Sequence, residues 1–147
     1  MEEKKHRNAV RIIRILLVIA MFVSGSIIFA RRGNTMNAGL RFDPDAFVFP
    51  EQDGTLTRVK YSEITELEYL ERPDYGAPEG GEAVKGVRCG RWRSESLGAY
   101  SACASEWIRG AVRAKAGGTV YVFNVESEDT TRELYKTLQE MIASAED

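Results

Sequence analysis

The stretch TVYVFNVESEDTTRELYKTLQEMIASA (residues 119–145) contains two different apolar patterns, one after the other. Residues 119–125 are rich in β-branched and aromatic side chains, which is typical of a strand. Within residues 127–145, apolar side chains recur at positions that share one face of an α-helix. These are Leu134, Leu138, Met141 and Ile142. Thr130 and Glu133 have the spacing of a helix capping box. The stretch therefore predicts a last strand followed by an amphipathic C-terminal helix.

Short strand signals, separated by turn signals, fill the chain before this stretch. The predicted strands are 40–42, 46–50, 55–61, 64–70, 83–93, 97–105 and 107–115. Within 64–70, apolar Leu67 and Tyr69 alternate with Glu66 and Glu68, as in a strand with one face on the core and one in water. We therefore predict a mainly β domain of about seven antiparallel strands. They would form a barrel or sandwich whose open end the C-terminal helix covers.

Several local motifs in this order resemble those of small bacterial pleckstrin-homology (PH) domain families. The motifs are Tyr61, Ile64 and Leu67, the segment 86–90 (GVRCG), Phe123-Asn124, and 128–130 (EDT) followed by 134–138 (LYKTL). The resemblance covers roughly residues 39–142. It departs in the middle, where Ser94-Glu95-Ser96 and the small-residue run 99–105 replace the apolar residues that relatives carry.

The resemblance implies a seven-stranded PH-like fold with a helix at one end, in a membrane-associated bacterial protein that binds a partner. It implies no activity, because such domains share no catalytic residues. It does not imply phosphoinositide binding either. The first loops of this domain, Pro44-Asp45 and Gln52-Asp53-Gly54, are acidic where a basic loop would be needed.

A long apolar run precedes the predicted domain. It extends from Ile15 to Ala30 without a charge, and Arg14, Arg31 and Arg32 flank it. With snorkelling arginines at both ends, such a helix is long enough to span a bilayer. We therefore predict a basic tail at 1–11, a transmembrane helix at 12–32, a linker at 33–39 and the PH-like domain at 40–145. The alternative is a cleaved leader that releases a secreted soluble domain or enzyme.

The charges around the apolar run predict its orientation. Five basic residues precede it (Lys4, Lys5, Arg7, Arg11 and Arg14) and three follow it (Arg31, Arg32 and Arg41). By the positive-inside rule the N-terminus lies inside a bacterial cell membrane and the domain lies outside the cytoplasm. The opposite orientation would make the domain a cytoplasm-facing scaffold of a membrane complex. Residues 33–147 carry 13 basic and 20 acidic residues, a balance that argues against nucleic acid as a partner.

The sequence contains no recognisable catalytic or cofactor motif. Its single histidine, His6, lies in the basic tail, so the domain has no histidine for a nucleophile–histidine pair. The two cysteines do not have the spacing of a metal cluster, and there is no phosphate-binding loop or dinucleotide motif. We therefore expect no catalytic residues, no metal and no cofactor, and a protein that acts by binding.

Basic residues gather between residues 83 and 116, inside an otherwise acidic domain. The candidate ligand-binding residues are Arg88, Arg91, Arg93, Arg109 and Arg113. If these arginines share one outer face, they would bind an anionic lipid, an envelope polymer or an acidic protein. The competing interpretation is a solvated face whose arginines pair with Glu66, Glu68 and Glu71.

Cys89 and Cys103 lie in two consecutive predicted strands. A hairpin that turns at Ser94-Glu95-Ser96 would place residue 89 opposite residues 101–103. The two cysteines could then form a disulfide, which would persist outside the cytoplasm. The alternative is a pair of small, buried thiols.

Overall fold

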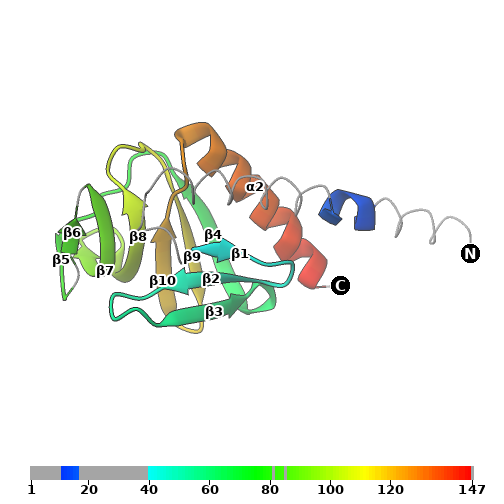
Figure 1. The fold of residues 1–147 in the computed structure, drawn as a ribbon, viewed down its shortest axis with the longest axis horizontal. Coiled ribbons are helices and arrows are strands. Elements are labelled where there is room, and N and C mark those ends of the chain that lie inside the picture. Colours follow the sequence, from blue (N-terminus) through cyan, green and yellow to red (C-terminus); the bar gives the residue numbers. More distant parts are fainter. Residues whose placement is uncertain (1–10, 17–39, 81, 85, 147) are drawn as a thin grey trace, which may run out of the picture.

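A computed structural model describes residues 11–16, 40–80, 82–84 and 86–146. Residues 11–16 are helical, and the rest form two β-sheets and a C-terminal helix (Figure 1). Among the described residues, no helix is both long enough and apolar enough to cross a membrane. Of the predicted tail (1–11), transmembrane helix (12–32) and linker (33–39), only residues 11–16 are described, so those predictions lie largely outside the described chain.

The smaller sheet is an antiparallel meander of β1 (Arg41–Phe42), β2 (Ala46–Pro50) and β3 (Leu56–Lys60). The turn between β2 and β3 is the one that the sequence predicts. Asp53 closes it by accepting hydrogen bonds from the Thr55 amide (2.9 Å) and hydroxyl (2.6 Å). Gly54 has a φ of 86°, a conformation that glycine adopts without strain.

The larger sheet has seven strands in the order β4-β9-β10-β8-β7-β5, with β6 also paired to β7. The strands are β4 (Ile64–Leu70), β5 (Ala77–Pro78), β6 (Glu82–Val84), β7 (Val87–Ser94), β8 (Gly98–Ser105), β9 (Ala111–Ala116) and β10 (Thr119–Phe123). The predicted turn at residues 94–96 forms and joins β7 to β8, and a turn at Gly117-Gly118 joins β9 to β10.

The mainly β prediction with a C-terminal helix is confirmed, but three of its details are wrong. The described residues form ten strands instead of about seven, because β5 forms where no strand is predicted and the predicted strand 83–93 is divided into β6 and β7. The sheets are not entirely antiparallel, since β10 pairs with β8 in parallel. The two sheets do not close into a barrel. A hairpin accounts for the parallel pair: β9 and β10 turn back on each other, and β10 inserts between β9 and β8.

The C-terminal helix α2 (Glu128–Ala145) begins two residues before the predicted cap, Thr130. Its N-cap is Ser127, whose side chain accepts a hydrogen bond from the Thr130 amide at 3.1 Å. The predicted capping box of Thr130 and Glu133 is therefore wrong, because Ser127 already satisfies the exposed amide at that position. Glu128 and Asp129 lie in the first turn, where the positive end of the helix dipole favours acidic side chains.

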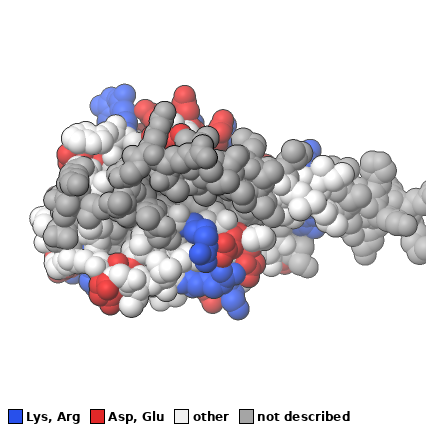
Figure 2. Space-filling model, in the orientation of Figure 1, with Lys and Arg blue, Asp and Glu red and all other residues white. Residues whose placement is uncertain are grey.

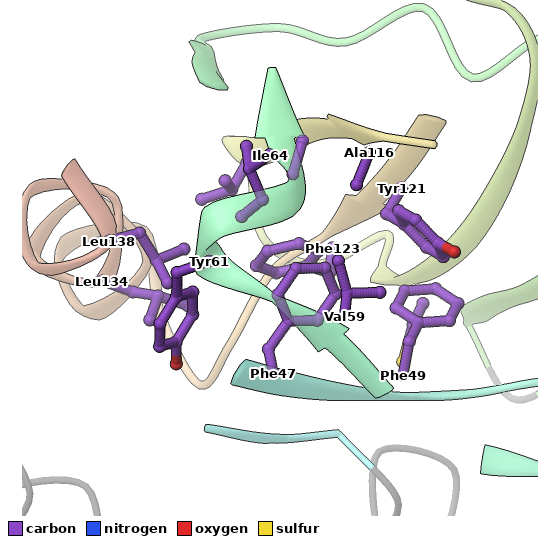
Figure 3. Packing of buried hydrophobic residues seen from close by; sticks show 13 residues of the cluster. Phe47, Phe49, Val59, Tyr61, Ile64, Ala116, Tyr121, Phe123, Leu134 and Leu138 are labelled. Atoms are coloured by element: carbon purple, nitrogen blue, oxygen red, sulfur yellow. The ribbon is translucent and has the colours of Figure 1, made fainter. Parts of the chain in front are cut away.

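The main hydrophobic core lies between the two sheets and α2 (Figure 3). Aromatic rings from β2 and β10 meet in its centre, with Phe47 and Phe123 at a centroid distance of 5.4 Å. From the other side, Leu134 and Leu138 of α2 pack next to Tyr61. Tyr61 is buried, and its hydroxyl donates a hydrogen bond to the Asp43 carbonyl at 2.8 Å. One face of the larger sheet, the smaller sheet and the helix thus share one core.

A second, smaller cluster covers the opposite face of the larger sheet. Its buried members are Trp92, Tyr100, Ala102, Ala111, Val120 and Val122, with Leu70, Tyr75 and Leu97 at the edge. Residues of β10 alternate between the two clusters, because neighbouring side chains on a strand point to opposite faces. Two of the candidate arginines, Arg88 and Arg113, lie on this second face.

Candidate functional site

The five candidate arginines do not share one face of the larger sheet. Across the sheet, Arg91 is in register with Ser101, and through it with Tyr121 of β10, which faces the main core. Arg113 is in register with Val122, which faces the second cluster. Because adjacent rows of a sheet point to opposite faces, Arg91 and Arg113 lie on opposite sides.

The other three arginines do not bring the candidate residues onto one face. By the same register, Arg93 lies on the same face as Arg91, whereas Arg88 lies on the same face as Arg113. Arg109 is exposed in the turn before β9. The single outer face required for a shared anion site is therefore not formed, and this premise of the prediction is corrected by the strand register.

Two of these arginines pair with neighbouring carboxylates. Arg113 contacts Glu66 at 2.8 Å, and Arg93 contacts Glu79 at 3.1 Å. The hydrogen bond from Arg113, supported by the charge of Lys115 at 3.5 Å, lowers the pKa of Glu66 below its ordinary value. On the face drawn in Figure 2, basic and acidic side chains lie next to each other instead of separating into areas of one sign. For Arg93 and Arg113, the competing interpretation of a solvated, ion-paired face fits the structure.

Arg88 lies in an aromatic setting on the second face. Its guanidinium carbon is 4.1 Å from the centre of the Tyr75 ring and 5.8 Å from that of Trp92. Glu106 contacts it at 3.7 Å. Burial raises the pKa of Tyr75 to about 12, so its phenol stays neutral beside the cation. Arg88 therefore anchors the start of β7 to the loop between β4 and β5 and to the turn after β8.

The turn after β8 presents the most exposed large apolar side chain of the described residues. We call residues 106–109 the Trp107 tip, in which Trp107 is 73% exposed. The tip packs over Gly86: a Cβ atom there would lie 2.7 Å from the indole ring. Arg109 is also exposed, and Ile108 is half-buried. The tip thus exposes an indole and a guanidinium that are two residues apart in the sequence.

A buried asparagine holds the two ends of the Trp107 tip together. Asn124 is fully buried, and its Oδ1 accepts a hydrogen bond from the Ser105 amide at 2.7 Å. Its Nδ2 donates to the carbonyls of Ser105 (3.0 Å) and Gly110 (3.2 Å). At the near end, the Glu106 amide donates to the Gly86 carbonyl at 2.8 Å. The tip is therefore exposed but fixed at its base.

The sequence interpretation missed the Trp107 tip by assigning residues 107–115 to a single strand. The structure starts β9 only at Ala111, and the predicted strand is wrong for the residues before it. Gly110 was the available signal. Its position is too close to the Tyr69 ring for any side chain, since a Cβ atom would lie 1.9 Å from the Tyr69 hydroxyl. Glycine inside a strand pattern often marks such a close approach.

Cys89 and Cys103 are directly opposite each other in β7 and β8, as the predicted hairpin requires. Cys103 is fully buried, and burial raises the pKa of its thiol to about 12. Cys89 is half-buried. Whether the two sulfurs become bonded stays a prediction.

Among the described residues, no three or more histidine, cysteine or acidic side chains come together in a way that could hold a metal ion. His6 lies outside the described chain. The chain matches no family model, no curated protein and no solved structure. The resemblance to PH domains therefore stays a prediction from local motifs.

Proposed function

We propose that this protein is a non-catalytic, membrane-anchored binding module with a PH-like domain. A single N-terminal helix would hold it in a bacterial cell membrane, with its N-terminus inside and residues 40–145 outside the cytoplasm. The uncharged run from Ile15 to Ala30 and the basic residues before it support the anchor and its orientation. The mainly β domain with a C-terminal helix agrees with a PH-like architecture at the level of composition and element order.

The Trp107 tip is the observation that carries the binding role. Tryptophan and arginine are the residues that most often dominate the energy of protein interfaces. A fixed loop also loses little conformational freedom on binding, so less of the contact energy is spent on ordering it. Trp107 and Arg109 are exposed on a turn that Asn124 ties at both ends. The tip therefore has both the composition and the rigidity of a contact site.

The geometry favours a partner protein over an anionic polymer or lipid surface. A polyanion would be bound best by several cations on one face, and the arginines lie on both faces of the larger sheet. One protruding indole fits a pocket on a protein surface. We therefore propose an extracytoplasmic protein partner whose pocket accepts Trp107 and whose acidic rim contacts Arg109.

Site-specific photo-crosslinking tests this role in the full chain in its native membrane. A photoreactive phenylalanine analogue replaces either Trp107 or Leu56, which is the matched control because it is also an exposed large apolar residue, at 56%. We expect a discrete protein adduct from position 107 and none from position 56. Co-purification of the crosslinked protein should be lost in Trp107→Ala and retained in Leu56→Ala.

Two results would contradict the proposal. One is the same set of adducts from both positions, which would indicate random collisions. The other is retention on anionic liposomes that depends on Arg91 and Arg93 but not on Trp107. That result would assign the binding role to a lipid headgroup and to a different surface.

A further inference from the structure

The pairing of β7 with β8 places Cys89 and Cys103 in a defined type of strand pair. In an antiparallel ladder, directly opposed residues alternate between hydrogen-bonded and non-hydrogen-bonded pairs. The Glu106 amide donates to the Gly86 carbonyl, so residues 86 and 106 form a hydrogen-bonded pair. Val87 and Ser105 come next in the register and Cys89 and Cys103 follow two steps later. The two cysteines therefore form a non-hydrogen-bonded pair.

The carbonyl groups of the two cysteines support this assignment. The Cys103 carbonyl accepts a hydrogen bond from the backbone N–H of Asn124 at 3.4 Å. The Cys89 carbonyl accepts one from the Trp92 indole N–H at 3.0 Å. Both acceptors are thus engaged outside the β7–β8 ladder. The Cα atoms of a non-hydrogen-bonded pair lie about 4.5 Å apart. Disulfides span Cα distances of about 4.4–6.8 Å, so the strands need not move apart for a bond to form.

The two thiols differ in access. Cys89 is half-buried, whereas Cys103 is fully buried in the main core. Burial, together with the nearby Cys89, raises the pKa of the Cys103 thiol. A reagent in solution therefore meets Cys89 first, and Cys103 reacts only with a sulfur that is already beside it.

We propose that Cys89 and Cys103 form an oxidisable dithiol site in which Cys89 is the entry sulfur and Cys103 the resolving sulfur. The oxidant is a disulfide, either a small molecule or an oxidoreductase. The Cys89 thiolate attacks the donor disulfide, a mixed disulfide forms, and one donor thiol leaves. The Cys103 thiol then loses its proton and attacks the Cys89 sulfur, and the second donor thiol leaves. The protein loses two protons and two electrons, and the donor disulfide becomes two thiols.

The new bond would lie close to the base of the Trp107 tip. It would join β7 to β8 three positions from the Gly86–Glu106 hydrogen bond on which the tip rests. Oxidation would therefore oppose opening of this end of the hairpin. The site does not depend on the proposed binding role, since the opposed cysteines are a property of the strand register alone.

Oxidised glutathione is the probe for this site. The full chain, purified in detergent and fully reduced, is incubated with it, unfolded, alkylated and measured by intact mass. We expect the wild type to lose two hydrogens, take up no alkyl groups and yield a peptide in which Cys89 is bonded to Cys103. The reaction should be faster at pH 9 than at pH 7, because a higher pH increases the thiolate fraction of both cysteines.

The single variants separate the two roles. Cys103→Ala should stop at one glutathione on Cys89, because no resolving thiol remains, and Cys89→Ser should gain none. Two alkylated cysteines in the oxidised wild type would overturn the proposal, as would a bond between two chains instead of within one. The wild-type mass decides the question even if a variant fails to fold. The mass measurement does not depend on crosslinking at Trp107. The dithiol proposal and the binding proposal can therefore be contradicted independently of each other.

Discussion

Asn124 is the single residue on which the geometry of the candidate site most depends. Its short amide satisfies three backbone groups at once, on both sides of the Trp107 tip. A buried backbone group that loses its partner costs free energy, because water cannot replace the lost hydrogen bond. Its three hydrogen bonds all go to residues that flank the turn, so it contributes directly to the shape of the turn.

We expect Asn124→Ala to lower the free energy of unfolding by about 3 kcal/mol. The change leaves the buried amide and carbonyl of Ser105 and the carbonyl of Gly110 without the hydrogen bonds that Asn124 makes to them. Chemical denaturation measures this change, and hydrogen exchange should show faster exchange at the Ser105 amide. The control is Thr57→Ala, which removes a part-buried hydrogen bond to Glu51 and should cost at most about 1 kcal/mol. Equal losses in the two variants would mean that the tip is not held by Asn124.

At the scale of elements, β4 and β9 show how charges are arranged on the exposed part of the second face. Glu66 of β4 lies opposite Lys115 and also contacts Arg113. Opposite charges on neighbouring strands stabilise the register of an antiparallel pair. The pairing lowers the pKa of Glu66, so its carboxylate gains more from the folded state than its protonated form does.

This shift predicts a stability change at acid pH. A carboxyl whose pKa is lowered by folding adds stability above its unfolded pKa, and this stability is lost as the pH falls through the folded value. The Glu66 contribution should therefore be complete above the ordinary value of 4.5 and disappear below it. Carboxyl NMR should find a pKa below 4.5 in the wild type, and a higher pKa in Arg113→Gln. Arg93→Gln, on the other face, should leave the Glu66 titration unchanged; if it shifts equally, the local pairing is not the cause.

Elements whose signals are local could be predicted from the sequence, and pairings between distant segments could not. The bounds of β2 and β4 match the predicted segments because alternation and turn residues define them. The sequence analysis did not predict that β10 lies in the middle of the larger sheet, between β9 and β8. In the structure its side chains alternate between two buried clusters, as expected for a strand that is buried on both faces. The arginines illustrate the same limit: their spacing was visible, but the face each one occupies depends on the register of strands far apart in the chain.

At the scale of the whole molecule, α2 packs against the core that the two sheets share. Leu134 and Leu138 reach the core formed by the smaller sheet and one face of the larger sheet (Figure 3). The strands β5 to β7 lie at the opposite side of the domain from the helix (Figure 1). The core next to α2 should therefore dominate global stability, whereas the second cluster should contribute less.

We expect Leu138→Ala to cost about 2–5 kcal/mol of unfolding free energy, because it leaves a cavity where helix and sheets meet. Leu97→Ala is the matched control, since it removes the same atoms from a half-buried residue at the edge of the second cluster. Its cost should be clearly smaller. Urea denaturation measures both, and a larger loss for Leu97→Ala would show that the second cluster is the main source of stability.

The central place of β10 also has a consequence for the order in which the domain folds. This strand follows all the others in the sequence, yet it separates β8 from β9 in the larger sheet. Until residues 119–123 are available, the β7–β8 hairpin and the pairing of β4 with β9 have no shared partner. Non-local pairing of this kind slows folding, because the loops must close before the contacts form. During synthesis the β4–β9 pair and the β7–β8 hairpin would therefore remain unpaired with each other until β10 is made. β10 would then join them into one sheet.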